Sequence, residues 1–489
     1  MGKGLRRWVA GVGVGAVLGC VVFALSFPKS SEDKRKSPMI AFLQGSFTGL
    51  IVPENISTIP LFHLNANLWD TLLTPDGPGV ASLSSVSDDQ TRYQFTVRNV
   101  AKFSNGRSIK SEDVKFSLDR ILALQETGHF SAKSLIKSVV VESENNFSIY
   151  LWRPAPSFLY LLSIPELGIV PREACDPGGK VVSLNVTSGA YVVESLSQGS
   201  QEVVLKKNGH FSRFVPTAPE VVRVRFVANA DDLVELAGKQ NVDFIELYDS
   251  VGVSVFPLLR KLEGYTYAIT KPSYSVFLVA DPRSLSVGDR ASVRRILDKD
   301  LRYQPIADIE QRSFQLLPPR TFGSLDAISM PAMREEDASL RSPRRLNLAS
   351  FGSKSKLFDE IGASLGRAGY EVRFGNAQNG GDFDLLLIGQ GMNADHPEIE
   401  LFLSLVSSWS VIPVGQRQKD IVSAAAYELD DKKRRDAIRE IGSELLSSNV
   451  VIPLVLRSYV HFYSKARFGT DSTVNYDGDV LFYRMPIKQ

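Results

Sequence analysis

The stretch of this chain that comes nearest to a catalytic motif is residues 362–366, which match the G-x-S-x-G pattern of serine hydrolases around Ser364. Such a serine becomes a nucleophile only where a strand turns sharply into a helix and exposes the hydroxyl. Here Leu357, Ile361 and Leu365 recur at helical spacing across the motif itself. We therefore expect Ser364 to lie inside a helix, and a secreted serine hydrolase that uses Ser364 is a remote alternative.

The sequence contains none of the known motifs in which residues are spaced to bind a metal ion or a nucleotide. The five histidines are scattered, and neither they nor the two cysteines form an H-E-x-x-H or C-x-x-C pattern. The chain also has no Walker A sequence and no dinucleotide fingerprint. The basic run at residues 432–435 is flanked by acidic residues, as is typical of a solvated helix face. We expect no catalytic residue, no metal and no cofactor.

Composition narrows the class of protein. The chain has 489 residues, of which 44% are hydrophobic and 22% charged, and Lys plus Arg exceed Asp plus Glu by 56 − 54 = 2. These values are typical of a globular protein and exclude a disordered or multi-span membrane chain. Such a balanced charge gives no field for holding nucleic acid, so we expect no such partner. The length indicates two large domains or about three of ordinary size.

The elements that must position any site alternate between strand and helix patterns. Residues 93–97 alternate apolar and polar side chains as a half-buried strand does, and Ser111 can cap a helix over the segment that follows. Residues 450–456 read as a final buried strand. This order predicts an α/β fold in which helices cover sheet faces. Further predicted elements are helices at 231–237, 356–366, 421–429 and 432–446, and strands at 242–247, 345–349, 370–374 and 384–388.

The N-terminal segment predicts export. Basic residues precede an uncharged apolar stretch over residues 8–27, which is long enough to cross a bilayer once. Three outcomes remain open: cleavage after Ser26, lipidation of Cys20 in a loose lipobox, or retention as a membrane anchor. All three place the rest of the chain outside the cytoplasm, in the periplasm or cell envelope.

Four ordered segments and a closing strand carry a family resemblance. Residues 68–122 hold the most specific signal, and residues 187–191 (TSGAY), 286–296, 382–403 and 444–456 follow in order. The matching positions in the first segment are Phe95, Arg98, Lys102, Phe103, Gly106, Glu112, Asp113, Val114, Phe116, Ser117, Leu118 and Arg120. On these residues the chain resembles the family 5 bacterial extracellular solute-binding proteins, which serve oligopeptide, dipeptide and nickel importers. It departs from the family at Ala280 and Asp281, where a Phe-Asn pair is usual.

The resemblance implies a two-lobed periplasmic-binding-protein fold of type II, with an extra subdomain inserted in the first lobe. Residues 1–37 would be the signal or anchor segment and linker. The expected base lobe combines residues 38–67, 182–280 and 465–489; the inserted subdomain is 68–181, and the second lobe is 281–464. In such a fold the lobes close around a ligand by a hinge motion.

The resemblance also supplies candidate ligand-binding residues. Asp395 would pair with the terminal ammonium of a peptide, the alternative being a turn or helix-cap aspartate before a proline. Met392 and Asn393 would line the same segment, where the tryptophan frequent in the family is missing. Arg457 could meet a ligand carboxylate or form a surface salt bridge. Tyr274 could stack on the ligand or complete a sheet edge.

The predicted function is therefore that of a monomeric, non-enzymatic solute-binding protein of an ABC importer. Its partners would be a peptide or a similar small solute and the permease subunits in the membrane. The alternative in the same fold is a transport-inactive, membrane-anchored sensor or envelope interaction module. The missing Phe-Asn pair, the missing tryptophan and an uncleaved anchor would all favour that alternative.

Overall fold

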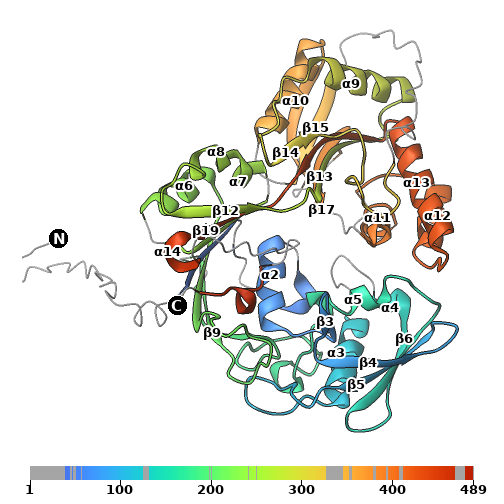
Figure 1. The fold of residues 1–489 in the computed structure, drawn as a ribbon. Helices are drawn as coiled ribbons and strands as arrows, with labels where there is room; N and C mark the ends of the chain where they lie inside the picture. Colours follow the sequence, from blue (N-terminus) through green and yellow to red (C-terminus); the bar gives the residue numbers. More distant parts are fainter. Residues whose placement is uncertain are drawn as a thin grey trace, which may run out of the picture.

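A computed structural model of the chain describes residues 39–44, 47, 51–56, 58–124, 132–197, 199, 201–239, 242–248, 250–325, 345–351, 355–377, 382–391, 395–406, 411–468 and 480–487. The predicted export segment, with Cys20 and Ser26, lies outside these residues. Within them, no helix combines the length and apolar character that a bilayer crossing requires. The described residues form three sheets of four to seven strands and one short hairpin (Figure 1).

The base lobe is built on a seven-stranded sheet with the order β12-β19-β11-β1-β10-β9-β8. In β10 the buried Val222, Val224 and Phe226 alternate with more exposed arginines, so one face of the sheet packs on the core. The strands are β1 (Met39–Gln44), β8 (Tyr191–Ser197), β9 (Glu202–Lys207), β10 (Val221–Val227), β11 (Phe244–Leu247), β12 (Tyr265–Ile269) and β19 (Val460–Ser464). The helices are α2 (Ile59–Leu68), α6 (Ala230–Lys239), α7 (Ser250–Ser254), α8 (Phe256–Leu259) and α14 (Lys465–Phe468).

The inserted subdomain contains a four-stranded antiparallel sheet with the order β4-β5-β7-β6. Helix α3 begins at Ser111, but its first turn is closed by Asp113, whose carboxylate accepts from the Lys110 N–H at 2.9 Å. The expected cap by Ser111 is therefore wrong by one position. The strands are β2 (Leu73–Thr74), β3 (Gly77–Pro78), β4 (Ala81–Val86), β5 (Arg92–Val97), β6 (Ile136–Val141) and β7 (Asn146–Leu151). The helices are α3 (Ser111–Ala123), α4 (Ala132–Leu135) and α5 (Phe158–Leu161).

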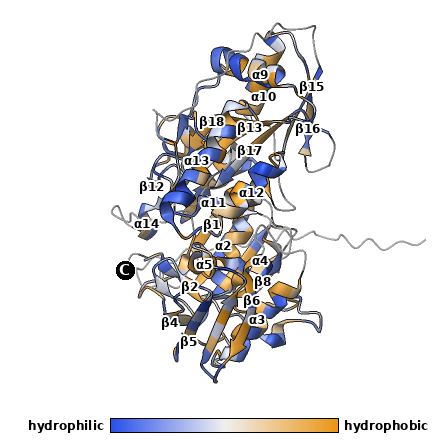
Figure 2. Ribbon diagram, turned by 90° about the vertical axis from the view of Figure 1, so that its right-hand side faces the viewer, coloured by the Kyte–Doolittle hydropathy of each residue, from blue (hydrophilic) through white to orange (hydrophobic). Residues whose placement is uncertain are grey.

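The second lobe has a six-stranded mixed sheet with the order β14-β18-β13-β17-β15-β16, and helices cover both of its faces (Figure 1). Its inner strands are mostly hydrophobic because both faces are covered (Figure 2). The strands are β13 (Tyr274–Ala280), β14 (Glu310–Arg312), β15 (Arg345–Ser350), β16 (Glu371–Asn376), β17 (Leu385–Gly391) and β18 (Val451–Arg457). The helices are α9 (Val287–Asp300), α10 (Lys356–Arg367), α11 (Pro397–Leu405), α12 (Gln416–Ala425) and α13 (Asp431–Ser447).

Short 3₁₀ turns complete the described elements, at Pro53–Asn55, Pro165–Leu167, Arg172–Ala174 and Phe482–Arg484. The last of these brings the C-terminal segment back to the base lobe, where Val480 and Phe482 donate backbone hydrogen bonds to α2 side chains. The C-terminal segment thus contacts α2 of the base lobe, and the assignment of residues 465–489 to that lobe stays a prediction.

Two chain crossings connect the base lobe to the second lobe, one between β12 and β13 and the other between β18 and β19. They run side by side: the Thr270 N–H donates to the Tyr459 carbonyl at 3.0 Å, and the Ser273 N–H donates to the Arg457 carbonyl at 3.2 Å. Because β13 pairs only with strands of the second lobe, and β19 only with strands of the base lobe, two expected boundaries are corrected. The crossings lie at residues 270–273 and 458–459 instead of 280/281 and 464/465.

Candidate functional site

Three tyrosine rings gather where the two crossings meet. Tyr248 follows β11 of the base lobe, Tyr274 opens β13 of the second lobe, and Tyr459 lies in the crossing between β18 and β19. The ring centroids of Tyr274 and Tyr459 are 6.1 Å apart, and those of Tyr248 and Tyr459 are 6.3 Å apart. We call these three residues the hinge aromatic cluster. It joins the lobes through a contact that a change of hinge angle must alter.

The ring of Tyr274 packs across the neighbouring strand of the second lobe. A Cβ atom on Gly389 of β17 would lie 2.4 Å from the Tyr274 ring, so glycine is needed for the strand and ring to approach this closely. Since β13 lies inside its sheet, Tyr274 does not complete a sheet edge, and that alternative is wrong. Its stacking on a ligand stays a prediction.

Arg457 is buried in an ion pair. Its side chain is 1% exposed, and its Nε and Nη2 atoms donate to Oε1 of Glu310 at 2.9 and 2.6 Å. The other oxygen of Glu310 accepts from the Tyr303 hydroxyl at 2.6 Å and from the Ile306 N–H at 3.0 Å. The alternative of a surface salt bridge is therefore wrong, because this pair is interior. A contact between Arg457 and a ligand carboxylate stays a prediction.

Asp395 lies between β17 and α11, on the loop that faces the inserted subdomain. Its side chain is exposed, whereas the next residue, His396, packs its ring 5.7 Å from the Tyr160 ring of α5. The predicted companions Met392 and Asn393 lie outside the described residues. Asp395 thus directly precedes a residue that joins the second lobe to the inserted subdomain.

The same contact continues along α11 and α12. Ile399 of α11 packs with the apolar core of the inserted subdomain, and the guanidinium carbon of Arg153 lies 3.2 Å from the ring centroid of Tyr427. A small pocket at this contact is lined from both sides, by Ser134, Leu135 and Ser157 of the inserted subdomain and by Glu398, Ile399, Ala426 and Tyr427 of the second lobe. The two parts therefore touch at a rim, which we call the lip, as well as at the hinge.

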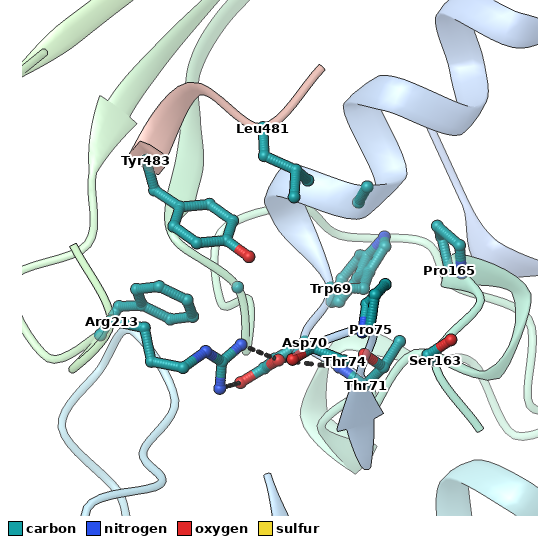
Figure 3. A pocket seen from close by; sticks show the side chains of 13 residues that line it. Trp69, Asp70, Thr71, Thr74, Pro75, Ser163, Pro165, Arg213, Leu481 and Tyr483 are labelled. Carbon is teal, nitrogen blue, oxygen red and sulfur yellow. Dashed lines mark hydrogen bonds and ion pairs between the residues drawn. The ribbon is translucent and has the colours of Figure 1, made fainter. Parts of the chain in front are cut away.

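A second pocket lies away from the lip, where α2, the β2–β3 hairpin and the C-terminal segment meet (Figure 3). Its polar wall is the ion pair of Arg213 with Asp70, whose two hydrogen bonds are 3.0 and 2.5 Å long. Trp69 also lines it, with an indole N–H that is buried and has no hydrogen-bond partner. Sequence reasoning did not single out these residues, since only the tertiary fold brings position 213 to position 70.

A buried polar cluster lies inside the base lobe. Nε2 of His63 is 2.8 Å and Nε2 of His461 is 3.6 Å from Oε1 of Glu246, and all three side chains are buried. Burial alone would raise the pKa of Glu246, but the two histidines outweigh it and lower the pKa to about 2. The described residues contain no group of three or more His, Cys, Asp or Glu side chains arranged to hold a metal ion.

Ser364 lies inside α10 and is fully buried, as the helical spacing predicted. Its hydroxyl donates to the Asp300 carbonyl at 3.2 Å and accepts from Nη2 of Arg367 at 2.9 Å. A substrate cannot reach this oxygen without unfolding the helix packing, so the residue has no nucleophile geometry.

Two α/β lobes joined by a double crossing of the chain are typical of the type II periplasmic-binding-protein fold. A crystal structure of a dipeptide-binding protein from Pseudoalteromonas sp. SM9913 in complex with Met-Leu superimposes with a TM-score of 0.79 at 14% identity, covering 92% of this chain and 100% of that one. NikA from Brucella suis in complex with Fe(III)-EDTA gives 0.75 at 17% identity, covering 91% and 100%. These likenesses show the fold.

The model of the bacterial extracellular solute-binding proteins, family 5, middle region, matches residues 77–298 of this chain. A probable D,D-dipeptide-binding periplasmic protein of Escherichia coli is 26% identical over 199 residues, which are 37% of this chain and 38% of that protein. A dipeptide-binding protein of Lactococcus lactis is 21% identical over 286 residues, or 53% of this chain and 51% of that protein. The matched regions are therefore well under two thirds of these relatives' lengths. The predicted motifs at 382–403 and 444–456 lie beyond the family match.

Proposed function

We propose that this protein works outside the cytoplasm, where it captures a peptide or a similar small solute between its lobes and delivers it to the permease subunits of an ABC importer. The observation that carries the proposal is the double crossing of the chain at residues 270–273 and 458–459, with the Asp395 loop facing the inserted subdomain at the lip. The match to the family 5 model and the similarity to relatives named for dipeptide binding support it.

Capture requires that the ligand bind the closed form more tightly than the open form. A ligand between the lobes touches the second lobe and the first lobe only when they are close, so its contacts supply that difference. Closure also removes water, which strengthens a charge-assisted contact. The exposed carboxylate of Asp395 is the group that we assign to the terminal ammonium of a peptide.

Binding of this kind changes no covalent bond of the solute, and we propose that the protein is not an enzyme. The burial of Ser364 within α10 supports this proposal against the hydrolase alternative. A fluorophosphonate probe should leave the folded protein unlabelled. Covalent modification of Ser364 in the folded protein would contradict the proposal.

The experiment that tests the proposed ligand is a thermal-shift screen against di- to pentapeptides, nickel and sugars. A ligand at 100 times its Kd stabilises the protein by about 2.7 kcal/mol, which gives a clear rise in melting temperature. We expect peptides with a free N-terminus to bind, and Asp395→Ala to weaken them far more than their N-acetylated forms. Asp382→Ala, at the other end of β17, is the matched control because Asp382 is also exposed. Equal losses for both kinds of peptide would refute the role of Asp395.

A further inference from the structure

The lip contains a polar arrangement that links the Asp395 loop to the inserted subdomain. We call Tyr160, His396, Glu398 and Arg434 the lip latch. Nδ1 of His396 is 3.0 Å from Oε1 of Glu398, and the His396 ring also packs against Tyr160 at an interplanar angle of 32°. His396 is therefore held from its own lobe while it contacts the opposite one.

The second lobe fixes the buried end of the latch firmly. Glu398 is fully buried, and Nη1 of Arg434 donates to its Oε1 at 3.0 Å. Arg434 in turn donates from Nη2 to Asp431 at 3.0 Å, and its guanidinium carbon lies 4.3 Å from the Phe322 ring centroid. Since α13 and α11 hold this pair together, the position of His396 and of its neighbour Asp395 is set by these two side chains.

The opposite side of the latch exists only while the lobes are close. Tyr160 belongs to the inserted subdomain, and the crossings at the hinge are the covalent links between the lobes in the described chain. The contacts of Tyr160 with His396, of Arg153 with Tyr427, and of Ile399 with the subdomain core must all separate when the hinge opens. Their free energy therefore favours the closed form before any ligand contact is counted.

The closed lip also carries an opposing cost. Oε2 of Glu398 is buried and has no hydrogen-bond partner, although it lines the pocket at the lip. A buried carboxylate oxygen without a partner is unfavourable, and water can reach it when the lip opens. The lip thus combines contacts that favour closure with a polar group that favours opening, which suits a protein that must release its ligand.

We propose that the lip latch biases the lobes toward closure and positions Asp395, with Glu398 and Arg434 as positioning residues that hold His396 against Tyr160. The part of this inference that concerns ligand affinity rests on the proposed function. The part that concerns the lobes does not, because the contacts join two parts of the same chain.

The test measures the distance across the lip in the ligand-free full chain. Spin labels at Lys133 and Lys432, both exposed and on opposite sides of the lip, report it by pulsed electron resonance, with Cys20 and Cys175 replaced by serine. Tyr160→Ala and His396→Ala should each move population from short to long distances, and the double variant should move no more than either single one. Unchanged distributions, or independent effects in the double variant, would overturn the latch.

A second readout separates positioning from general destabilisation. Glu398→Ala should lengthen the lip distance as His396→Ala does, whereas Glu398→Gln, which keeps an oxygen acceptor for Arg434, should restore the short one.

For a peptide found by thermal shift, Tyr160→Ala should raise the dissociation rate about two- to tenfold and leave the association rate unchanged. If no peptide binds the unaltered protein, the proposed function fails while the distances still test the latch. If peptides bind and the distances do not respond, the latch fails alone.

Discussion

Replacement of Asp243 by asparagine should remove a loss of stability that the protein undergoes as pH rises toward neutrality. Asp243 directly precedes β11, and its Oδ2 accepts a hydrogen bond from the Ile40 N–H of β1 at 2.9 Å. Burial raises the pKa of Asp243 to about 6, against the opposing effects of the Ile40 N–H and of Arg467. The folded protein therefore holds a proton on Asp243 more readily than the unfolded chain does.

The sign of the pH dependence follows from this difference. Between the unfolded pKa of 3.8 and the folded pKa of about 6, the folded state binds more protons, so stability falls as pH rises through that window. The contribution of Asp243 to the free energy of unfolding is fully present below pH 3.8, and it is lost completely above the folded pKa of about 6. Its size is about 2.2 pKa units at 1.36 kcal/mol each, or about 3 kcal/mol. The asparagine variant keeps an oxygen acceptor for Ile40 and has no proton to lose.

The assay is urea unfolding of both proteins at several pH values from 4 to 7.5, followed by circular dichroism. The free energy of unfolding of Asp243→Asn minus that of the unaltered protein should rise across this range by up to about 3 kcal/mol. Because only the change with pH is compared, a constant effect of the substitution cancels. A difference that stays flat, or that falls as pH rises, would refute the reasoning.

Three further outcomes follow from packing and burial. Glu310→Ala leaves Arg457 buried without its carboxylate and should cost about 3–5 kcal/mol in urea unfolding. The same substitution of Glu371, which is exposed and paired with Arg345, should cost less than about 1 kcal/mol. Equal losses for the two substitutions would contradict the interior role of Glu310. Gly189→Ala places a Cβ 2.5 Å from the backbone of Leu68 and should lower the melting temperature, whereas Gly199→Ala, with nothing within 4 Å, should not. Burial raises the pKa of the Cys175 thiol, so iodoacetamide at pH 7 should alkylate the folded protein more slowly than the urea-unfolded chain, and equal rates would count against that burial.

Local periodicity predicted most of the individual elements. The helix expected at 356–366 is α10 (Lys356–Arg367), and the helix expected at 432–446 is α13 (Asp431–Ser447). The helix expected at 421–429 is instead α12 (Gln416–Ala425), displaced toward the N-terminus. Tyr427 continues the apolar spacing that predicted the helix, but it lies beyond the helix end and packs against Arg153 across the lip.

Sheet membership and site partners were not available from local patterns. The expected lobe boundary at 280/281 came from the family resemblance, and only the strand pairing of β13 (Tyr274–Ala280) shows that these residues join the sheet of the second lobe. Glu310 lies 147 positions from Arg457, so no spacing rule connects them. Glu398 and Arg434 likewise meet only because α11 and α13 cover the same face of the second lobe.

The central claim is that the two lobes close on a small solute, and small-angle X-ray scattering tests it directly. The radius of gyration should be measured with and without a saturating peptide from the thermal-shift screen. We predict that the peptide lowers the radius of gyration, and that Asp395→Ala at the same peptide concentration retains the ligand-free value. A peptide that binds at saturation while the radius of gyration stays unchanged would contradict the account.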